Sequence, residues 1–318
     1  MGSDVLLCTD DFWDEHGTAV RAAAPELDVV VLTGDDRVAD EDLARITLAF
    51  FSHDAWPDRA RAFVGAALQC PQLAWFHTMS AGVDSPVFGR MVDDGVRLTT
   101  SSGASAPPIA RTVMMYLLAL ARKLPERIRD QADGRWGWER WDELEGRRLV
   151  VVGYGPIGRE VVRLASCFGM DPVIVRRQIR GDEPCETRVL GELHDVVAGA
   201  DAVVVALPLN DDTRGIVSAE LIGAMPPHAF FVNVGRGELV DQDALTAALA
   251  AARLGGAGLD VTTPEPLPPD DPLWTLPNVI ITPHNSGSTD GTGRRAAEAF
   301  LANLARWVAD EPLANEVG

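Results

Sequence analysis

The sequence predicts an α/β fold with two domains, each built around a parallel sheet. Two series of short apolar runs alternate with helix-forming segments, one in the first hundred residues and one from residue 147 onward. Such β-branched runs are typical of strands buried on both faces. A chain of 318 residues is also too long for one ordinary core and fits two domains.

The first series predicts a small α/β domain. Its apolar runs are VLLC (5–8), VVVL (29–32), ITLAFF (46–51) and LAWFH (73–77). From Pro107 to Lys123 the chain becomes a long helix-forming run that starts with proline, whose missing N–H costs nothing in a first turn. We interpret this helix as the bridge between the domains. The charged run from Asp4 to Glu15 is interpreted as a solvated loop.

The second series predicts a doubly wound domain, because each strand is followed by a helix or by a turn rich in Gly and Pro. The strands are expected within residues 147–153, 172–176, 201–208, 229–235, 256–261 and 278–284. A final helix over Asp290–Ala309 is expected to return and pack on the first domain. The proline cluster from Pro264 to Pro272 predicts an irregular loop.

Composition excludes several classes of partner. The formal charge of −19 and pI near 4.6 disfavour nucleic acid, which needs clustered Lys and Arg. The four cysteines, Cys8, Cys70, Cys167 and Cys185, show neither CxxC spacing nor a histidine at metal-ligand spacing, so no metal site or disulfide framework is expected. The longest apolar stretch is far shorter than a membrane span, and no signal-peptide core follows Met1. A cytoplasmic protein is expected.

A glycine-rich turn predicts a dinucleotide site. The segment GYGPIG follows the strand LVVV and precedes a helix-forming run. Gly155 lets the backbone approach a pyrophosphate, Gly158 lets helix and strand pack closely, and the helix N-terminus favours an anion. Pro156 has no N–H, so Ile157 is the expected donor, and Gly153 opens the turn. In this strand–turn–helix context the motif predicts dinucleotide binding.

The second strand of this unit predicts which dinucleotide is bound. An acid about 20 residues after the glycines would accept a hydrogen bond from the ribose 2′-hydroxyl of NAD. Here the strand ends in Arg176-Arg177, with Arg180 close by. A guanidinium pairs bidentately with a 2′-phosphate instead. The sequence therefore favours NADP(H) over NAD(H), although a solvated arginine loop is the alternative.

Three later segments predict a catalytic site. NVGRG with Arg236, LDVTTPEP with Glu265 and TPH with His284 follow consecutive strands, whose carboxyl ends share the ligand-binding edge of such sheets. Reduction of a 2-oxo acid needs a cation for the carboxylate and carbonyl, and a proton donor beside the carbonyl oxygen. Arg236 suits the first task and His284 the second. Glu265 could pair with the imidazole, favour its charged form and fix its orientation.

With these residues the chain resembles the D-isomer-specific 2-hydroxyacid dehydrogenase family. The similarity runs over nearly the whole length, through SAGVD (80–84), GYGPIG (153–158), LPLNDDTRGIV (207–217), NVGRG (233–237), LDVTTPEPLP (259–268) and PLWTLPNVIITPH (272–284). The resemblance implies a Rossmann cofactor domain, residues 103–285, inserted into a smaller flavodoxin-like substrate domain, residues 1–102 and 286–318. It also implies a homodimer formed through the cofactor domain.

The resemblance assigns roles to residues in these motifs. Arg236 binds the substrate carboxylate and carbonyl, His284 is the general acid/base, and Glu265 supports it. Asp260 faces the nicotinamide end of the cofactor. Further cofactor contacts are expected from Leu207, Pro208, Thr213 and Val234. Backbone N–H groups of the loop Met79, Ser80, Ala81 and Gly82 are expected to bind the substrate carboxylate.

Two departures from the family pattern stand out. Where many relatives have Ala-Glu after the bridging loop, this chain has Ala110-Arg111. Where many have an acid after the second strand, it has Arg176, which the 2′-phosphate interpretation explains.

His77 either lines the substrate pocket or is a strand-end histidine bonded to backbone. Trp136, Trp138 and Trp141 are interpreted as packing residues or a subunit contact rather than as a stacking platform for a ligand.

Two other functions remain open from the sequence. One is oxidation of a different small anion on the same scaffold. Formate is disfavoured, because formate-oxidising relatives carry an amide at the position of Glu265, whereas phosphite is not excluded by any motif. The other is a cofactor-sensing binding protein like the corepressors that share this fold, which the lack of a basic or disordered tail disfavours. The identity of the 2-oxo acid is not predicted.

Overall fold

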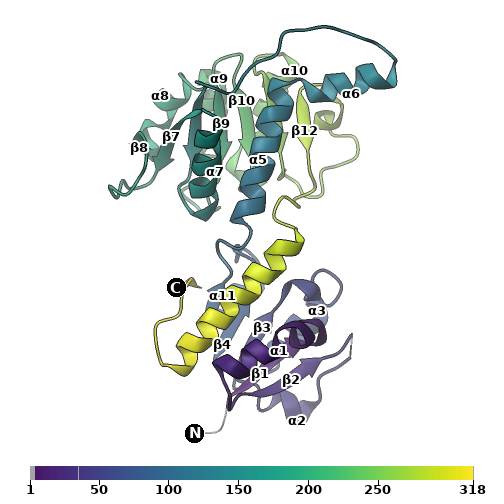
Figure 1. The fold of residues 1–318 in the computed structure, drawn as a ribbon, viewed down its shortest axis with the longest axis vertical. Helices are drawn as coiled ribbons and strands as arrows, with labels where there is room; N and C mark the ends of the chain where they lie inside the picture. Colours follow the sequence, from purple (N-terminus) through teal and green to yellow (C-terminus); the bar gives the residue numbers. More distant parts are fainter. Residues whose placement is uncertain (1–3, 35, 318) are drawn as a thin grey trace. The chain divides into compact units, whose positions relative to one another are not determined.

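The computed structural model describes residues 4–34 and 36–317, and the chain divides into two compact units (Figure 1). Unit 1 consists of Met1–Ser105 and Thr289–Gly318, and unit 2 is Ala106–Ser288. The boundaries predicted from the sequence, after residues 102 and 285, each lie three residues before those of the structure.

A mainly parallel sheet forms the centre of unit 1. Its strands are β1 (Val5–Thr9), β2 (Asp28–Leu32), β3 (Leu48–Phe51), β4 (Trp75–Thr78), β5 (Arg97–Thr100) and the short antiparallel β13 (Glu316–Val317). The order β13-β5-β4-β3-β1-β2 contains the flavodoxin-type order 2-1-3-4-5, which confirms the predicted class. The four predicted strands are correct to within two residues. Strands β5 and β13 were not predicted.

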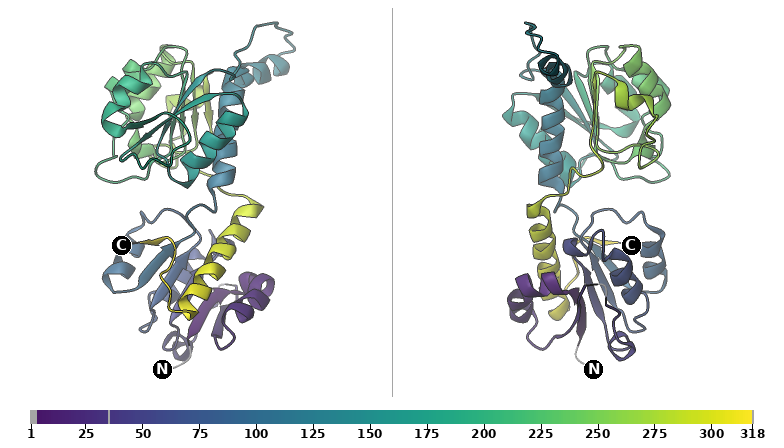
Figure 2. Two further views of the ribbon diagram at one scale, coloured as in Figure 1. Left: turned by 60° about the vertical axis from the view of Figure 1, so that its left-hand side comes forward. Right: turned by 90° about the vertical axis from the view of Figure 1, so that its right-hand side faces the viewer.

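Helices cover both faces of this sheet, as Figure 2 shows. On one face lie α1 (Asp10–Ala23) and α11 (Asp290–Val308), and on the other α2 (Asp40–Leu43), α3 (Ala60–Ala67) and α4 (Pro86–Asp93). Alternate strand residues point to opposite faces: Leu6 packs in one core with Phe300, and Leu7 in the other with Phe63. The predicted return of the last helix to unit 1 is confirmed.

The interpretation of residues 4–15 as a solvated loop is wrong. This segment forms β1 and the first turns of α1. The hydroxyl of Thr9 caps the helix by accepting the N–H of Phe12, and Asp10 and Asp11 lie in the first turn, where the helix dipole favours negative charge. Both carboxylates also pair with Arg59. The density of charged residues did not distinguish a loop from a helix, because acidic residues are also favoured in the first turn of a helix.

Unit 2 contains a seven-stranded parallel sheet. Its strands are β6 (Arg148–Val152), β7 (Asp171–Arg176), β8 (Thr187–Val189), β9 (Ala202–Val205), β10 (Phe230–Asn233), β11 (Gly256–Leu259) and β12 (Val279–Ile281). The order β12-β11-β10-β9-β6-β7-β8 is the Rossmann order with one strand added beyond the sixth. This confirms the predicted doubly wound fold, in which only β8 was not predicted.

Two helical layers sandwich this sheet. One contains α5 (Ala106–Ala121) and α7 (Pro156–Cys167), and the other α8 (Leu193–Val197), α9 (Ala219–Ala224) and α10 (Gln242–Ala250), while α6 (Leu124–Ala132) follows α5. Short 3₁₀ turns are η1 (His53–Ala55), η2 (Leu190–Glu192), η3 (Gly237–Leu239) and η4 (Pro272–Thr275). Helix α5 belongs wholly to unit 2, where it packs against α7, so its interpretation as a bridge is wrong.

Candidate active site

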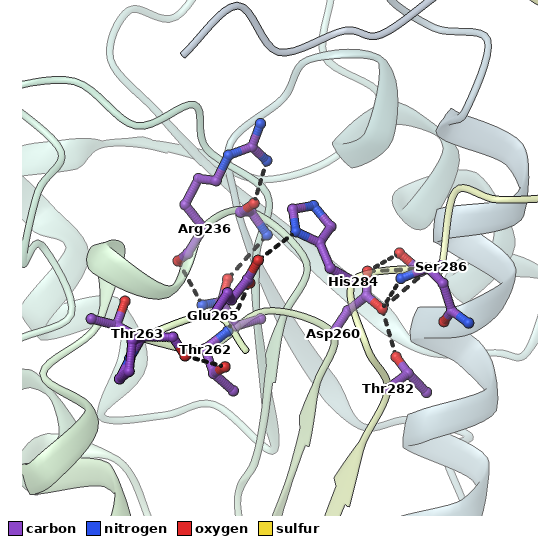
Figure 3. A network of polar contacts seen from close by, with 12 residues as sticks. Arg236, Asp260, Thr262, Thr263, Glu265, Thr282, His284 and Ser286 are labelled. Atoms are coloured by element: carbon purple, nitrogen blue, oxygen red, sulfur yellow. Dashed lines mark hydrogen bonds and ion pairs between the residues drawn. The ribbon is translucent and has the colours of Figure 1, made fainter. Parts of the chain in front are cut away.

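The carboxyl ends of β10, β11 and β12 bring three motifs to one edge of the unit 2 sheet. These strands are neighbours, and Asn233, Leu259 and Ile281 lie side by side in register at their last residues. The segments that follow them carry Arg236, Asp260 and His284. Because all three leave the sheet at the same level, their side chains gather there (Figure 3). The predicted grouping of strand ends is therefore confirmed.

An imidazole–carboxylate pair lies at the centre of this group. His284 Nδ1 is 2.8 Å from Glu265 Oε2, and the other carboxylate oxygen, Oε1, accepts the N–H of Thr262 at 3.1 Å. The side chains of His284 and Glu265 remain 46% and 38% exposed. Since Nδ1 is held by Glu265, Nε2 is the ring nitrogen available for proton exchange with a ligand.

The loop that carries Glu265 is held by Gln242 at the start of α10. The Gln242 amide donates to the Thr263 carbonyl at 2.8 Å and accepts the Thr263 N–H at 2.8 Å. Thr262 Oγ1 also donates to the Pro264 carbonyl at 3.0 Å. These bonds fix the backbone on the N-terminal side of Glu265. Gln242 and Thr262 were not singled out from the sequence, because an amide and a hydroxyl without a motif carry no signal of their tertiary contacts.

Arg236 is half-buried and its backbone is tightly fixed. Asn233 donates its side-chain amide to the Arg236 carbonyl at 2.8 Å and accepts the Gly235 N–H at 3.0 Å. The guanidinium donates to the Gly235 carbonyl at 2.8 Å. An added Cβ at Gly237 would lie 2.0 Å from the Thr262 carbonyl oxygen. The flanking Gly237 thus lets the Arg236 segment pack closely against the Glu265 loop.

Asp260 anchors the segment that carries His284. The residue is 3% exposed. Its carboxylate accepts Thr282 Oγ1 at 2.5 Å and the N–H groups of Asn285 and Ser286, each at 3.1 Å, as well as Ser286 Oγ. Such a satisfied buried carboxylate rigidifies its surroundings. Tyr116 OH extends the network by contacting Thr282 Oγ1. The expected position of Asp260 toward a nicotinamide stays a prediction.

The glycine-rich turn has the geometry that a pyrophosphate needs. Gly155 is the N-cap of α7, and an added Cβ there would meet no protein atom within 4 Å. By contrast, a Cβ at Gly158 would lie 2.0 Å from the Gly153 carbonyl, and one at Gly153, whose φ is 104°, would lie 2.5 Å from the Ala206 carbonyl. Two glycines therefore serve close packing, and Gly155 leaves open space before a helix N-terminus. These residues fit a dinucleotide.

A groove in unit 2 runs along this turn. It is lined by Gly153, Tyr154, Gly155, Arg159, Arg176, Arg177, Gln178, Arg180, Leu190, Leu207, Pro208, Asn210, Asp212 and Thr213. Eight of the predicted cofactor residues are thus brought together. Thr213 Oγ1 donates to the Pro208 carbonyl at 2.7 Å and orders one rim. Among predicted cofactor residues, Pro156, Ile157 and Gly158 begin α7, and Val234 follows β10 as a buried residue. Tyr154 and Arg159 were missed by the sequence analysis.

The loop of Met79, Ser80, Ala81 and Gly82 belongs to unit 1. The N–H of Met79 donates to the Phe51 carbonyl at 2.9 Å, and that of Ser80 donates to Thr78 Oγ1 at 3.3 Å. These two N–H groups are therefore used within unit 1. Ser80 Oγ also donates to the Gly82 carbonyl at 2.9 Å. Substrate binding by Ala81 and Gly82 stays a prediction.

His77 is fully buried in unit 1. Its Nδ1 is 2.7 Å from Thr99 Oγ1 and its Nε2 is 2.9 Å from Ser101 Oγ. Burial lowers the pKa of His77 to about 3, so the ring is neutral. The alternative, a histidine hydrogen-bonded to backbone, is wrong, because both partners are side-chain hydroxyl groups. Both ring nitrogens are engaged, which favours a structural role over a substrate contact.

Neither a membrane span nor a metal cluster is found in the described residues. Within residues 4–34 and 36–317, no helix combines the length and apolar character needed to cross a bilayer. The same residues contain no group of three or more His, Cys, Asp or Glu side chains placed to hold a metal ion.

Comparison with known proteins gives consistent matches. A family model described as the NAD binding domain of D-isomer specific 2-hydroxyacid dehydrogenases matches residues 114–286. A glyoxylate reductase/hydroxypyruvate reductase of Mus musculus is 30% identical over 316 residues, covering 95% of this chain and 94% of the mouse protein.

Solved structures agree over the whole chain. A D-isomer specific 2-hydroxyacid dehydrogenase family protein from Aeromonas salmonicida has a TM-score of 0.82 at 29% identity and covers 100% of this chain and 99% of its own. A D-isomer specific 2-hydroxyacid dehydrogenase from Xanthobacter autotrophicus Py2, in complex with NADPH and MES, has a TM-score of 0.81 at 31% identity, with 100% and 98% covered. The resemblance seen in the motifs is thereby confirmed: the chain belongs to the D-isomer specific 2-hydroxyacid dehydrogenase family and is an oxidoreductase.

Proposed function

We propose that this oxidoreductase uses NADP(H) to interconvert a small 2-oxo acid and the corresponding D-2-hydroxy acid, working mainly as a reductase. The observation that carries the proposal is the 2.8 Å pairing of His284 Nδ1 with Glu265 Oε2, beside Arg236, at the edge of the sheet whose glycine turn fits a dinucleotide. The mouse relative is named a glyoxylate reductase/hydroxypyruvate reductase, which supports this substrate class.

In the reduction, each side chain has one task. His284 holds a proton on Nε2 and gives it to the carbonyl oxygen, which becomes the hydroxyl of the product. Glu265 accepts the Nδ1–H, which orients the ring and compensates its charge before the transfer. Arg236 binds the carboxylate and polarises the carbonyl. The bound nicotinamide would supply the hydride. In the reverse direction His284 removes the hydroxyl proton.

Cofactor binding is assigned to the groove of unit 2. Gly155 and the N-terminus of α7 would hold the pyrophosphate, with Ile157 donating in place of Pro156. Arg176, Arg177 and Arg180 line the same groove and favour the 2′-phosphate of NADP(H). The Xanthobacter relative was solved with NADPH, which supports this preference. Leu207, Pro208 and Thr213 would line the opposite rim.

We also propose that the protein forms a homodimer through unit 2. Exposed apolar side chains gather on α6 and the loop after it, where Trp136 is fully exposed, Trp138 is 81% exposed and Ile128 is 58% exposed. Tryptophans this exposed are typical of an interface core. Static light scattering should give about twice the 34.2 kDa chain mass, and a Trp136→Ser/Trp138→Ser variant should shift toward monomer. A wild-type monomer would contradict this proposal.

We further propose a cytoplasmic location, because the cysteines of the described residues are free thiols, as is usual in a reducing compartment.

A substrate panel tests the function. Purified protein is assayed at 340 nm with NADPH or NADH and with glyoxylate, hydroxypyruvate, pyruvate, phenylpyruvate and branched 2-oxo acids. We expect turnover with at least one acid and a lower Michaelis constant for NADPH than for NADH. Phosphite with NADP is the control for the other enzymatic hypothesis. NADPH binding without turnover of any 2-oxo acid would contradict the proposal and favour a cofactor-sensing protein.

A further inference from the structure

The arginine at the end of β7 is held by the protein's own acids. Arg176 lines the groove, yet its side chain is only 12% exposed. Its Nη1 forms an ion pair with Glu183 Oε1 and lies 3.6 Å from Asp182 Oδ1. Thus two carboxylates from the following loop approach the guanidinium that would face a 2′-phosphate.

Glu183 is firmly seated in this position. Its side chain is 3% exposed, and its carboxylate accepts the N–H of Arg180 at 2.9 Å and that of Gly181 at 2.8 Å in addition to the Arg176 pair. Gly181 has a φ of 83°, which lets the loop turn both N–H groups toward Glu183. The Arg180 N–H, with that of Gly181 and the Arg176 guanidinium, lowers the pKa of Glu183 to about 2. Glu183 is therefore ionised at neutral pH.

The neighbouring cations are partly neutralised in the same way. The Tyr154 ring contacts two guanidinium groups, with the Arg159 carbon at 4.5 Å and the Arg176 carbon at 5.5 Å from its centroid. Arg159 also pairs with Asp182 at 3.2 Å. Asp182 and Glu183 thus balance the two arginines that flank Tyr154, whereas Arg177 and Arg180 are exposed.

We propose that Glu183, assisted by Asp182, is a cofactor-selectivity determinant that acts through Arg176 and weakens the preference for the 2′-phosphate, so that the protein accepts NADH as well as NADPH. This inference rests on the proposed cofactor site. A 2′-phosphate is a dianion at neutral pH and is repelled by both carboxylates, whereas a 2′-hydroxyl carries no charge and is not. Because three donors hold Glu183, it does not withdraw freely when a phosphate approaches.

Binding measurements separate charge from structure. Calorimetric Kd values are measured without substrate for NADPH, NADH, adenosine 2′,5′-bisphosphate and 5′-AMP, using wild type, Glu183→Gln and Asp182→Asn. Asp182 makes ion pairs with Arg159 and Arg176, so its variant leaves the Glu183 hydrogen bonds in place. Glu186→Gln is the matched control, because Glu186 pairs with Arg148 and Arg188 instead.

We expect Glu183→Gln and Asp182→Asn to lower the Kd of NADPH relative to NADH by roughly threefold to tenfold, and to do the same for the bisphosphate relative to 5′-AMP. Glu186→Gln should leave both ratios unchanged. Unchanged ratios in both test variants, equal weakening of all four ligands, or a selective loss of NADPH binding would overturn the inference. If wild type binds neither dinucleotide, the proposed cofactor site itself fails, which is a separate result.

Discussion

His284 depends on an unusual backbone conformation that its neighbours impose. Its φ of 50° lies in the left-handed region, which costs a non-glycine residue about 1–2 kcal/mol. The conformation is held by the His284 N–H, which donates to the Asp260 carbonyl at 2.8 Å, and by the Asp260 carboxylate, which binds the residues on both sides. Strain of this kind is common at functional sites. It sets the direction in which the side chain leaves the backbone, and the pairing with Glu265 then holds the ring.

At the same scale, Glu265→Gln tests the carboxylate. Glutamine keeps an oxygen that can accept the Nδ1–H, but it removes the negative charge that compensates a protonated ring. We therefore expect kcat for 2-oxo acid reduction to fall roughly 10- to 100-fold, with the Kd for NADPH within about twofold of wild type. Steady-state kinetics and calorimetry measure the two quantities. Glu220→Gln, at an exposed residue of α9, is the control and should change neither.

At the scale of elements, the turn from β6 to α7 assigns different tasks to its glycines. Gly155 has φ and ψ of −79° and −167°, a conformation open to any residue, and space in front of it. Gly158 lies against the Gly153 carbonyl, so a side chain there would push α7 away from β6. Gly158 therefore serves packing, whereas Gly155 is predicted to serve the ligand.

This division predicts opposite phenotypes for two alanine variants. Gly155→Ala should keep the Tm within about 2 °C of wild type and weaken NADPH binding at least about tenfold, because the new methyl occupies the approach to the backbone. Gly158→Ala should lower the Tm and reduce the free energy of unfolding by about 1–3 kcal/mol or more, because the new methyl group overpacks the contact between α7 and β6. Thermal unfolding and calorimetry test both. Equal losses of stability in the two variants would contradict the assignment.

The sequence predicts those elements and residues that are marked by a short local pattern, such as an apolar run or a motif. Apolar runs predicted most strands, and the motifs predicted Arg236, Glu265, His284 and most of the groove. Strand β5 has the polar sequence RLTT and β13 consists of two residues, so both depend on long-range pairing that no local pattern reports. Gln242, Asp182 and Glu183 act through tertiary hydrogen bonds and ion pairs, which residue type and spacing do not encode.

At the scale of the whole molecule, buried His77 makes stability depend on pH. Its pKa is about 3 in the folded protein and about 6.5 in an unfolded chain. Between these values the unfolded chain binds a proton that the folded protein does not, so stability falls as pH decreases from 6.5 toward 3, with a slope of up to about 1.4 kcal/mol per pH unit. Burial keeps the ring neutral, while Thr99 and Ser101 hydrogen-bond its two nitrogens.

Urea unfolding of the full chain between pH 7 and pH 4.5 measures this contribution. His77→Gln removes the titrating group and should be less stable at pH 7 by about 1–3 kcal/mol, because hydrogen bonds to Thr99 and Ser101 are weakened. The difference from wild type should shrink as pH falls, since only wild type loses the His77 contribution. A difference that is constant across this range would show that His77 does not titrate as described.

The catalytic assignment is tested most directly by His284→Ala in a paired measurement of turnover and cofactor affinity. With the best 2-oxo acid of the panel, we predict that kcat falls by at least about 100-fold while the Kd for NADPH stays within about twofold of wild type. Turnover close to wild type, or loss of NADPH binding together with activity, would contradict a proton-transfer role for His284.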